Sequence, residues 1–111
     1  MIIEKLICDY LSNKLNITAL PEKPNRPYDN KVFVERAGGT GSFLKETTIA
    51  IQSYGETKYN AATLNDLVIA TMLDIVELGE VTEISLNSNY DFTDTDTKEY
   101  RYQAVFDIVH Y

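Results

Sequence analysis

The sequence has one cysteine, one histidine and no tryptophan among its 111 residues. A lone cysteine, Cys8, excludes a disulfide within the chain and a zinc site built from several thiolates. Because Cys8 adjoins the apolar face of a predicted helix, we interpret it as a small buried hydrophobe. The histidine, His110, has no serine or cysteine partner beside it, so we interpret it as a strand residue. The sequence therefore indicates no catalytic residue, no cofactor and no metal site, and we expect no enzyme.

Long apolar runs are also missing. No run approaches the roughly 20 residues that a membrane-spanning helix needs, so we expect no membrane partner. The first residues, Met1 to Lys5, contain no basic region and no small-residue cleavage site, so we expect no signal peptide. With a single cysteine, these features favour a protein that folds in the cytosol.

Positive charge is scarce, with 10 Lys and Arg residues against 17 Asp and Glu residues and a net charge of −7. Proteins that wrap duplex DNA neutralise its phosphates with Lys and Arg, so this balance opposes tight DNA binding. An acidic surface still lets DNA slide past, and the alternative is that the charge only maintains solubility. The apolar share of 44% and the length fit one folded domain, residues 1–111.

Apolar periodicity predicts two helices. The first covers residues 2–14, and the second covers residues 58–78, with Thr57 or Asn60 as its N-cap and Gly79 at its end. The first helix has one apolar face made of Ile3, Leu6, Ile7, Tyr10 and Leu11. The second has a wider stripe made of Leu64, Leu67, Val68, Thr71, Met72, Ile75 and Val76.

Alternating and β-branched residues predict four strands, at residues 31–36, 47–54, 81–86 and 99–111. In the last strand one face is apolar and the other is half polar, which is typical of a sheet that helices cover on one side. The predicted fold class is therefore α+β with the order α-β-β-α-β-β. We expect a four-stranded, largely antiparallel sheet with two helices packed on one face.

Two connecting segments have a distinctive composition. Prolines at three-residue spacing predict an extended connector over residues 20–28, and a polyproline ligand is the alternative. Residues 37–42 are glycine-rich, and we expect them to form a flexible hairpin tip. A phosphate-binding loop is the alternative there, but it requires a lysine, then Ser or Thr, then a helix, and a strand follows instead.

Residues 87–98 form a predicted polar loop that contains Asp91, Asp94 and Asp96. Three carboxylates at close spacing suggest calcium, but the glycine and glutamate of an EF-hand loop are missing. The alternative is a turn whose Asp and Thr side chains bind backbone N–H groups. The nearby aromatic residues have few basic neighbours, so core or interface packing is favoured over base stacking; they are Tyr90, Phe92, Tyr100 and Tyr102.

The order of several short motifs resembles the small tail terminator, or tail completion, proteins of long-tailed bacteriophages. The motifs cover nearly the whole chain. They are Pro24-Asn25-Arg26-Pro27, Val32-Phe33-Val34-Glu35-Arg36, Gly38-Gly39, Ile49-Ala50-Ile51-Gln52-Ser53-Tyr54-Gly55, Ala61-Ala62, Asn89-Tyr90-Asp91-Phe92-Thr93-Asp94 and Arg101-Tyr102.

The resemblance implies a structural protein of the virion tail, assembled in the host cytoplasm as a ring, commonly a hexamer. Its partners would be other copies of itself, the tail tube protein and a head connector or completion protein. DNA would pass through without specific binding. We expect Gly38, Gly39, Gly41, Phe43 and Leu44 to form a mobile assembly arm. We expect Tyr90, Phe92, Asp94 and Arg101 to order a loop or contact another subunit.

Three alternatives remain open at this point. The chain could occupy another station at the head–tail junction or be another minor tail protein. It could be a small ligand-binding domain or enzyme, for which the acidic loop is the best support. It could also be an adaptor that binds one partner as a monomer.

Overall fold

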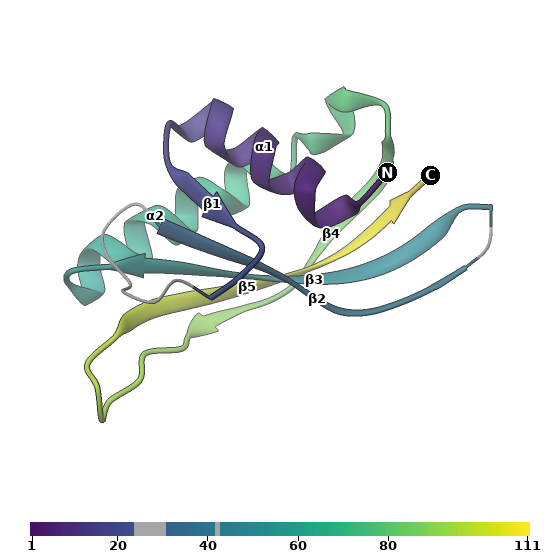
Figure 1. Cartoon of the computed structure of the whole chain (residues 1–111). Coiled ribbons are helices and arrows are strands. Elements are labelled where there is room, and N and C mark those ends of the chain that lie inside the picture. Colours follow the sequence, from purple (N-terminus) through teal and green to yellow (C-terminus); the bar gives the residue numbers. More distant parts are fainter. Residues whose placement is uncertain (24–30, 42) are drawn as a thin grey trace.

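The computed structural model describes residues 1–23, 31–41 and 43–111. These residues form an α+β fold with two α-helices on one face of a five-stranded sheet (Figure 1). The strand order across the sheet is β1-β2-β3-β5-β4. The elements are α1 (Ile3–Leu15), β1 (Thr18–Leu20), β2 (Lys31–Gly41), β3 (Lys45–Gly55), α2 (Lys58–Met72), the 3₁₀ helix η1 (Ile75–Leu78), β4 (Val81–Asp91) and β5 (Tyr100–His110).

Helix α1 follows the predicted apolar spacing closely. Ile3, Ile7 and Leu11 recur at four-residue intervals and are fully buried. Lys5 and Asp9 lie on an exposed side of the helix and form an ion pair of 2.9 Å. The helix ends at Leu15, and the following residue, Asn16, caps it with a left-handed φ of 53°. The prediction for this helix is confirmed to within one residue at each end.

Helix α2 begins at the predicted cap, since the Thr57 Oγ1 atom accepts a hydrogen bond from the Asn60 backbone N–H at 3.1 Å. The prediction of one helix to residue 78 is wrong in detail, because α2 ends at Met72 and η1 follows. Gly79, with a φ of 83°, ends η1 as expected. The predicted apolar stripe is too wide, because Leu67 and Val76 are 50% and 43% exposed.

The hydrophobic core lies between the helices and one face of the sheet. Alternate residues of the central strands point into it, as the predicted patterns of β3 and β5 require. Gly55 allows the close approach of α2, because a Cβ atom there would lie 2.5 Å from the Ala61 nitrogen. The sheet contributes Val32, Val34, Ile49, Ile51, Ala104, Phe106 and Ile108, and the helices contribute Ile3, Ile7, Leu11, Leu64, Val68 and Met72.

The prediction of four strands in the order α-β-β-α-β-β is corrected by β1. This strand pairs in parallel with β2, with Thr18 opposite Lys31 and Leu20 opposite Phe33, so the sheet is mixed and the order is α-β-β-β-α-β-β. A strand of three residues is too short for an alternating pattern to show, and its pairing depends on backbone groups. Leu20, assigned to the proline connector, belongs to β1, while Pro24 and Pro27 lie outside the described residues.

The glycine-rich segment is also corrected, because most of it is strand. Gly38, Gly39 and Gly41 belong to β2 and pair with Thr48, Thr47 and Lys45 of β3. Glycine has weak strand propensity, but the backbone of β3 supplies the ladder that holds it. At Gly41 the φ is 104° and a Cβ atom would lie 2.3 Å from the Leu44 carbonyl oxygen, so this turn requires glycine. Ser42 lies outside the described residues.

The predicted polar loop over residues 87–98 is too long, since β4 continues to Asp91. Asn and Ser disfavour strands in general, but this part of β4 is the border of the sheet, where polar side chains remain solvated. Asn89 also accepts a hydrogen bond of 2.6 Å from Asn65 of α2, which ties the extension to the helix layer.

The long strands project beyond the helices at both ends, in a molecule of 42 × 25 × 22 Å (Figure 1). Lys45 pairs with His110 at one end of the β3–β5 ladder, and Gly55 pairs with Tyr100 at the other. We call the first the hairpin end, comprising Gly38–Gly41, Phe43–Lys45 and Tyr111. We call the second the loop end, comprising Tyr90–Arg101 at the β4–β5 connection.

Candidate assembly interface

The hairpin end exposes apolar side chains. Phe43 and Leu44, in the turn between β2 and β3, are 80% and 41% exposed. The Phe43 ring packs edge-on against Tyr111, with 6.1 Å between the ring centroids. The backbone N–H of Tyr111 donates to the carbonyl of Glu80 at 3.2 Å, which holds the aromatic pair near the start of β4. A nearly bare aromatic ring held by a folded hairpin is typical of a contact surface.

Beside this turn the chain forms a hollow of about 390 Å³ along β2 and β3. Arg36 and Lys45 border it, and the three glycines leave the backbone of β2 uncovered. Arg36 also forms an ion pair of 2.6 Å with Glu4 of α1, which anchors the root of the hairpin to the helix layer. The five predicted arm residues therefore lie together, on a paired hairpin.

The loop end is organised around Arg101. Its Nε atom donates to the Phe92 carbonyl at 2.7 Å, and its guanidinium carbon lies 4.8 Å from the centroid of the Phe92 ring. Tyr90 packs edge-on against Phe92, with 5.9 Å between centroids. Tyr90 and Phe92 are 42% and 38% exposed, so this cluster presents aromatic surface to solvent. Three of the four residues predicted for the loop are in contact here.

Asp94, the fourth predicted residue, orders the turn. Its Oδ1 atom accepts hydrogen bonds from the backbone N–H groups of Asp96 at 3.0 Å and Thr97 at 3.3 Å. These bonds hold the pKa of the Asp94 carboxyl below its usual range. Asp94 also bridges to Glu99 through the backbone, and Lys98 adopts a left-handed φ of 56°. The interpretation that this loop uses its acidic side chains to satisfy backbone groups is confirmed for Asp94.

Asp91 is likewise engaged within the chain. Its carboxylate pairs with Lys58 at 2.9 Å and accepts the Thr93 backbone N–H at 2.9 Å. The hydrogen bond from Lys58 is the largest of the causes that lower the Asp91 pKa to about 2. In the described parts of the chain, no group of three His, Cys, Asp or Glu side chains is arranged to hold a metal ion.

A chain of hydrogen bonds on the uncovered face of the sheet was missed by sequence reasoning. Tyr54 OH donates to Gln52 Oε1 at 3.0 Å, and Gln52 Nε2 donates to Gln103 Oε1 at 3.1 Å. Gln103 Nε2 then donates to Tyr90 OH, and Arg101 Nη1 donates to Tyr54 OH at 3.5 Å. This series of hydrogen bonds connects β3, β5 and β4 and holds Tyr90 and Arg101 of the loop end in place.

These side chains are buried although neither described α-helix covers them: Tyr54 is 1% exposed, Gln52 7% and Gln103 8%. Burial raises the Tyr54 pKa, and the nearby Arg101 opposes that rise. Gln52 and Gln103 face each other across β3 and β5. The sequence offered one signal, a glutamine inside each of the two predicted strands. The register that brings these two glutamines opposite each other cannot be read from one sequence.

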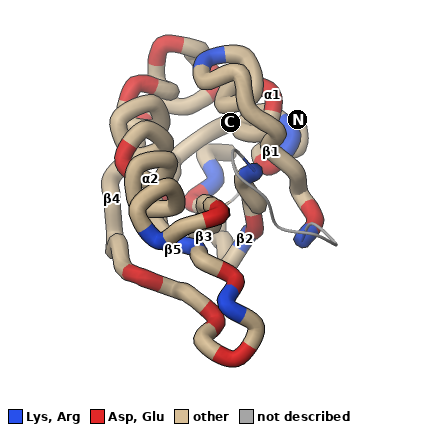
Figure 2. Tube along the Cα trace, turned by 90° about the vertical axis from the view of Figure 1, so that its left-hand side faces the viewer, with Lys and Arg blue, Asp and Glu red and all other residues tan. Residues whose placement is uncertain are grey.

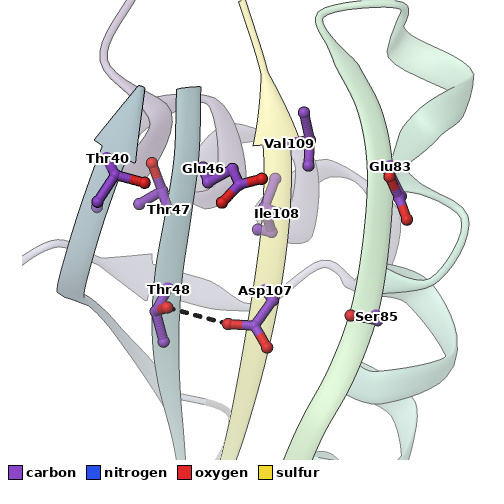
Figure 3. A pocket seen from close by; sticks show the side chains of 10 residues that line it. Thr40, Glu46, Thr47, Thr48, Glu83, Ser85, Asp107, Ile108 and Val109 are labelled. Atoms are coloured by element: carbon purple, nitrogen blue, oxygen red, sulfur yellow. Dashed lines mark hydrogen bonds between the residues drawn. The ribbon is translucent and has the colours of Figure 1, made fainter. Parts of the chain in front are cut away.

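The same face carries an acidic hollow of about 340 Å³ that reaches Gly39 and Thr40 of the hairpin end, and Figure 3 shows it from close by. Glu46, Glu83 and Asp107 line it together with hydroxyl groups. The Asp107 carboxylate accepts hydrogen bonds from Thr48 Oγ1 and Asn87 Nδ2, each of 3.0 Å. Asp107 is therefore tied to both neighbouring strands, and this hollow is a structural part of the sheet.

The single histidine and the single cysteine of the sequence are both buried. His110 lies in β5 as predicted and is 2% exposed. Its Nδ1 donates to the Tyr111 carbonyl at 2.9 Å, so in the neutral ring Nε2 accepts from Thr47 Oγ1 at 2.8 Å. Cys8 is 6% exposed, and burial raises its thiol pKa to about 11, as expected for a buried hydrophobe.

No protein-family model matches this chain, and no curated protein matches it. No helix in the described ranges is long and apolar enough to cross a membrane.

Proposed function

We propose that this chain is a structural subunit of a ring that caps a phage or prophage tail tube and joins it to the head. The observation that carries the proposal is the placement of the two predicted contact groups at opposite ends of the long axis. The residues expected to form an arm gather at the hairpin end, and those expected at the loop gather at the loop end. Both ends expose aromatic side chains.

This placement supports a ring for a geometric reason. A ring built by rotation needs two different surfaces on each subunit, so that one surface of each copy meets the other surface of the next. A chain with distinct surfaces at its two ends provides such a pair. A ring, which we expect to be hexameric, presents one side to the tail tube protein and the other to a head connector or completion protein.

The acidic composition supports a passage for DNA through such a ring. The net charge is −7, and Glu46, Glu83 and Asp107 gather on the uncovered sheet face. Carboxylates repel phosphates, so a lumen lined by this face would release DNA instead of binding it.

A tube-polymerisation assay tests this function. Tail tube protein would be polymerised alone, with this chain, and with an equal amount of an unrelated acidic protein of similar size. We expect short, capped tubes only with this chain, and electron micrographs with a ring at one tube end. Tubes that grow equally in all three reactions, without an added ring, would contradict the proposal. A monomer bound to one partner away from the tube end would favour the adaptor alternative.

A further inference from the structure

The negative charge of the chain is concentrated in one segment. Residues 59–97, which include nearly all of α2 and all of η1 and β4, contain eight acids and no Lys or Arg. The rest of the chain contains nine acids and 10 Lys and Arg residues, so it is nearly neutral. In Figure 2, α2 and β4 run side by side along one border of the molecule, where Asn65 donates to Asn89. The acidic character of the protein therefore belongs to this segment.

Apolar side chains are exposed where α2 leads through η1 into β4. Leu73 and Val76 are each 43% exposed, and Leu86 is 40% exposed. Between Leu73 and Leu86 the sequence has four acids and no cation. One of these acids, Glu77, pairs with Lys14 of α1 at 2.9 Å. We call the remaining exposed surface the acidic border, and it comprises Leu73, Asp74, Val76, Glu80, Glu83 and Leu86.

Strand β4 leaves its outer edge open beside this surface. In the described part of the chain it pairs with β5 alone and ends the strand order of the sheet. Lys and Pro, which commonly protect such an edge, are absent from β4. Two β-bulges interrupt its ladder with β5, and Glu83–Leu86 is the regular stretch between them. The free backbone groups of this stretch can pair with another extended chain.

The side chains of this stretch alternate between the two faces of the sheet. Ile84 packs against the hydrophobic core, and Leu86 lies opposite Phe106 of β5, so both belong to the face that the helices cover. Glu83 lines the acidic hollow on the uncovered face. An added strand would therefore meet apolar side chains on one face and carboxylates on the other.

We infer that the acidic border binds an extended segment of another protein in which basic residues alternate with apolar residues. The apolar side chains of that segment cover Leu86, and its Lys or Arg side chains face Glu83 and the neighbouring acids. A second copy does not fit, because two acidic borders repel each other and the rest of the chain has no comparable excess of cations. This inference goes beyond the proposed function and does not depend on it.

Fluorescence anisotropy with labelled octapeptides tests the inference. The probe alternates lysine with valine, and two control peptides alternate lysine with serine and glutamate with valine. We expect the lysine–valine peptide to bind about tenfold more tightly than either control, because each control lacks one half of the complementarity. Equal binding of the lysine–serine peptide would show attraction by charge alone and would overturn the inference.

Two double variants with the same change in charge locate the binding site. Glu80→Gln with Glu83→Gln should weaken binding of the lysine–valine peptide about fivefold, because two carboxylates at the site are lost. Glu22→Gln with Glu35→Gln removes two exposed acids elsewhere and should weaken it less than about twofold. Equal losses in the two double variants would contradict a site at the acidic border.

The apolar half of the contact has its own matched pair. Leu86→Ala should weaken binding about threefold, because it removes apolar surface that the peptide covers. Leu67→Ala makes the same truncation at a residue of α2 that is 50% exposed, and it should leave binding unchanged. Circular dichroism would verify that every variant is folded. Equal effects of the two truncations would count against the contact.

Amide chemical shifts provide the most local readout. On addition of the lysine–valine peptide, the backbone amide signals of Glu83–Leu86 should shift more than those elsewhere in the sheet, because the peptide pairs with this edge. Shifts centred instead on Thr48 and Asp107, inside the acidic hollow, would place the peptide on the sheet face and overturn the inference.

Discussion

Phe106 and Phe43 lie in regions of the molecule that are stabilised in different ways. Phe106, in the middle of β5, is fully buried beneath the helices, whereas Phe43 at the hairpin end is 80% exposed. In the middle of the sheet the apolar side chains are buried in one core, which includes Ile7, Ile51 and Val68. At the ends the strands run past the helices, and Phe43, Tyr90 and Phe92 are exposed to solvent.

The residues that stabilise the fold and the exposed residues that we propose for assembly therefore lie in separate parts of one sheet. Burial of the middle supplies the hydrophobic free energy of folding, roughly 25 cal/mol for each Å² of apolar surface removed from water. Exposed aromatic side chains at the ends add little to folding and are available to bind another chain. Substitutions should therefore affect unfolding in the middle and association at the ends.

The largest expected effect separates the two phenylalanines. Phe106→Ala should lower the free energy of unfolding by about 3–5 kcal/mol, because it removes a buried ring and leaves a cavity. Phe43→Ala should change it by less than about 0.5 kcal/mol, because the ring is already in water. Urea unfolding of both variants measures the difference. Similar losses would show that the hairpin end contributes to the core after all.

A smaller effect is expected on the uncovered face. Gln103→Ala leaves the Gln52 amide and the Tyr90 hydroxyl without their partner, which should cost about 1–3 kcal/mol of unfolding free energy. The triple variant Tyr54→Phe, Gln52→Leu and Gln103→Leu removes both amides together with the buried hydroxyl that donates to Gln52, so it should cost less than the single change. Urea unfolding compares the two. A larger loss in the triple variant would mean that these polar groups stabilise the sheet beyond satisfying each other.

The smallest expected effect concerns the loop end. Lys58→Met removes the hydrogen bond that lowers the Asp91 pKa to about 2, so that pKa should rise toward 3.8. The folded state depresses the Asp91 pKa, so its stabilisation is present above pH 4 and is lost as the pH falls toward 2. The pair is solvent-exposed, so the change in stability should be slight. NMR titration of the Asp91 carboxyl measures the pKa, and an unchanged value would contradict the pairing.

The sequence predicted the middle of the molecule better than its ends. Four-residue recurrence of Ile3, Ile7 and Leu11 specifies α1, and alternation through Ile49 and Ile51 specifies β3, because burial imposes those periods directly. The fold class and the use of both helices on one face follow from the same patterns. The three-residue strand β1 leaves no such pattern, since its pairing with β2 uses backbone groups.

At the ends, backbone pairing overrode local composition. Gly38 and Gly39 suggested a loop, yet β3 holds them in β2, and Asn87 to Tyr90 suggested a loop but extend β4. Tyr90, Phe92 and Arg101, which the sequence analysis grouped, lie in contact at the loop end, and their role in assembly stays a prediction. Their support by Tyr54, Gln52 and Gln103 depends on the register between β3 and β5, which the sequence alone does not specify.

The most direct test of the account is the mass of the wild-type chain by multi-angle light scattering over a wide range of concentration. Docking of one end on the other around a closed ring predicts a change from monomer to a single larger species, with no growth beyond it. A chain that stays monomeric at the highest concentration, or grows into ever larger species without closing, would contradict the central claim.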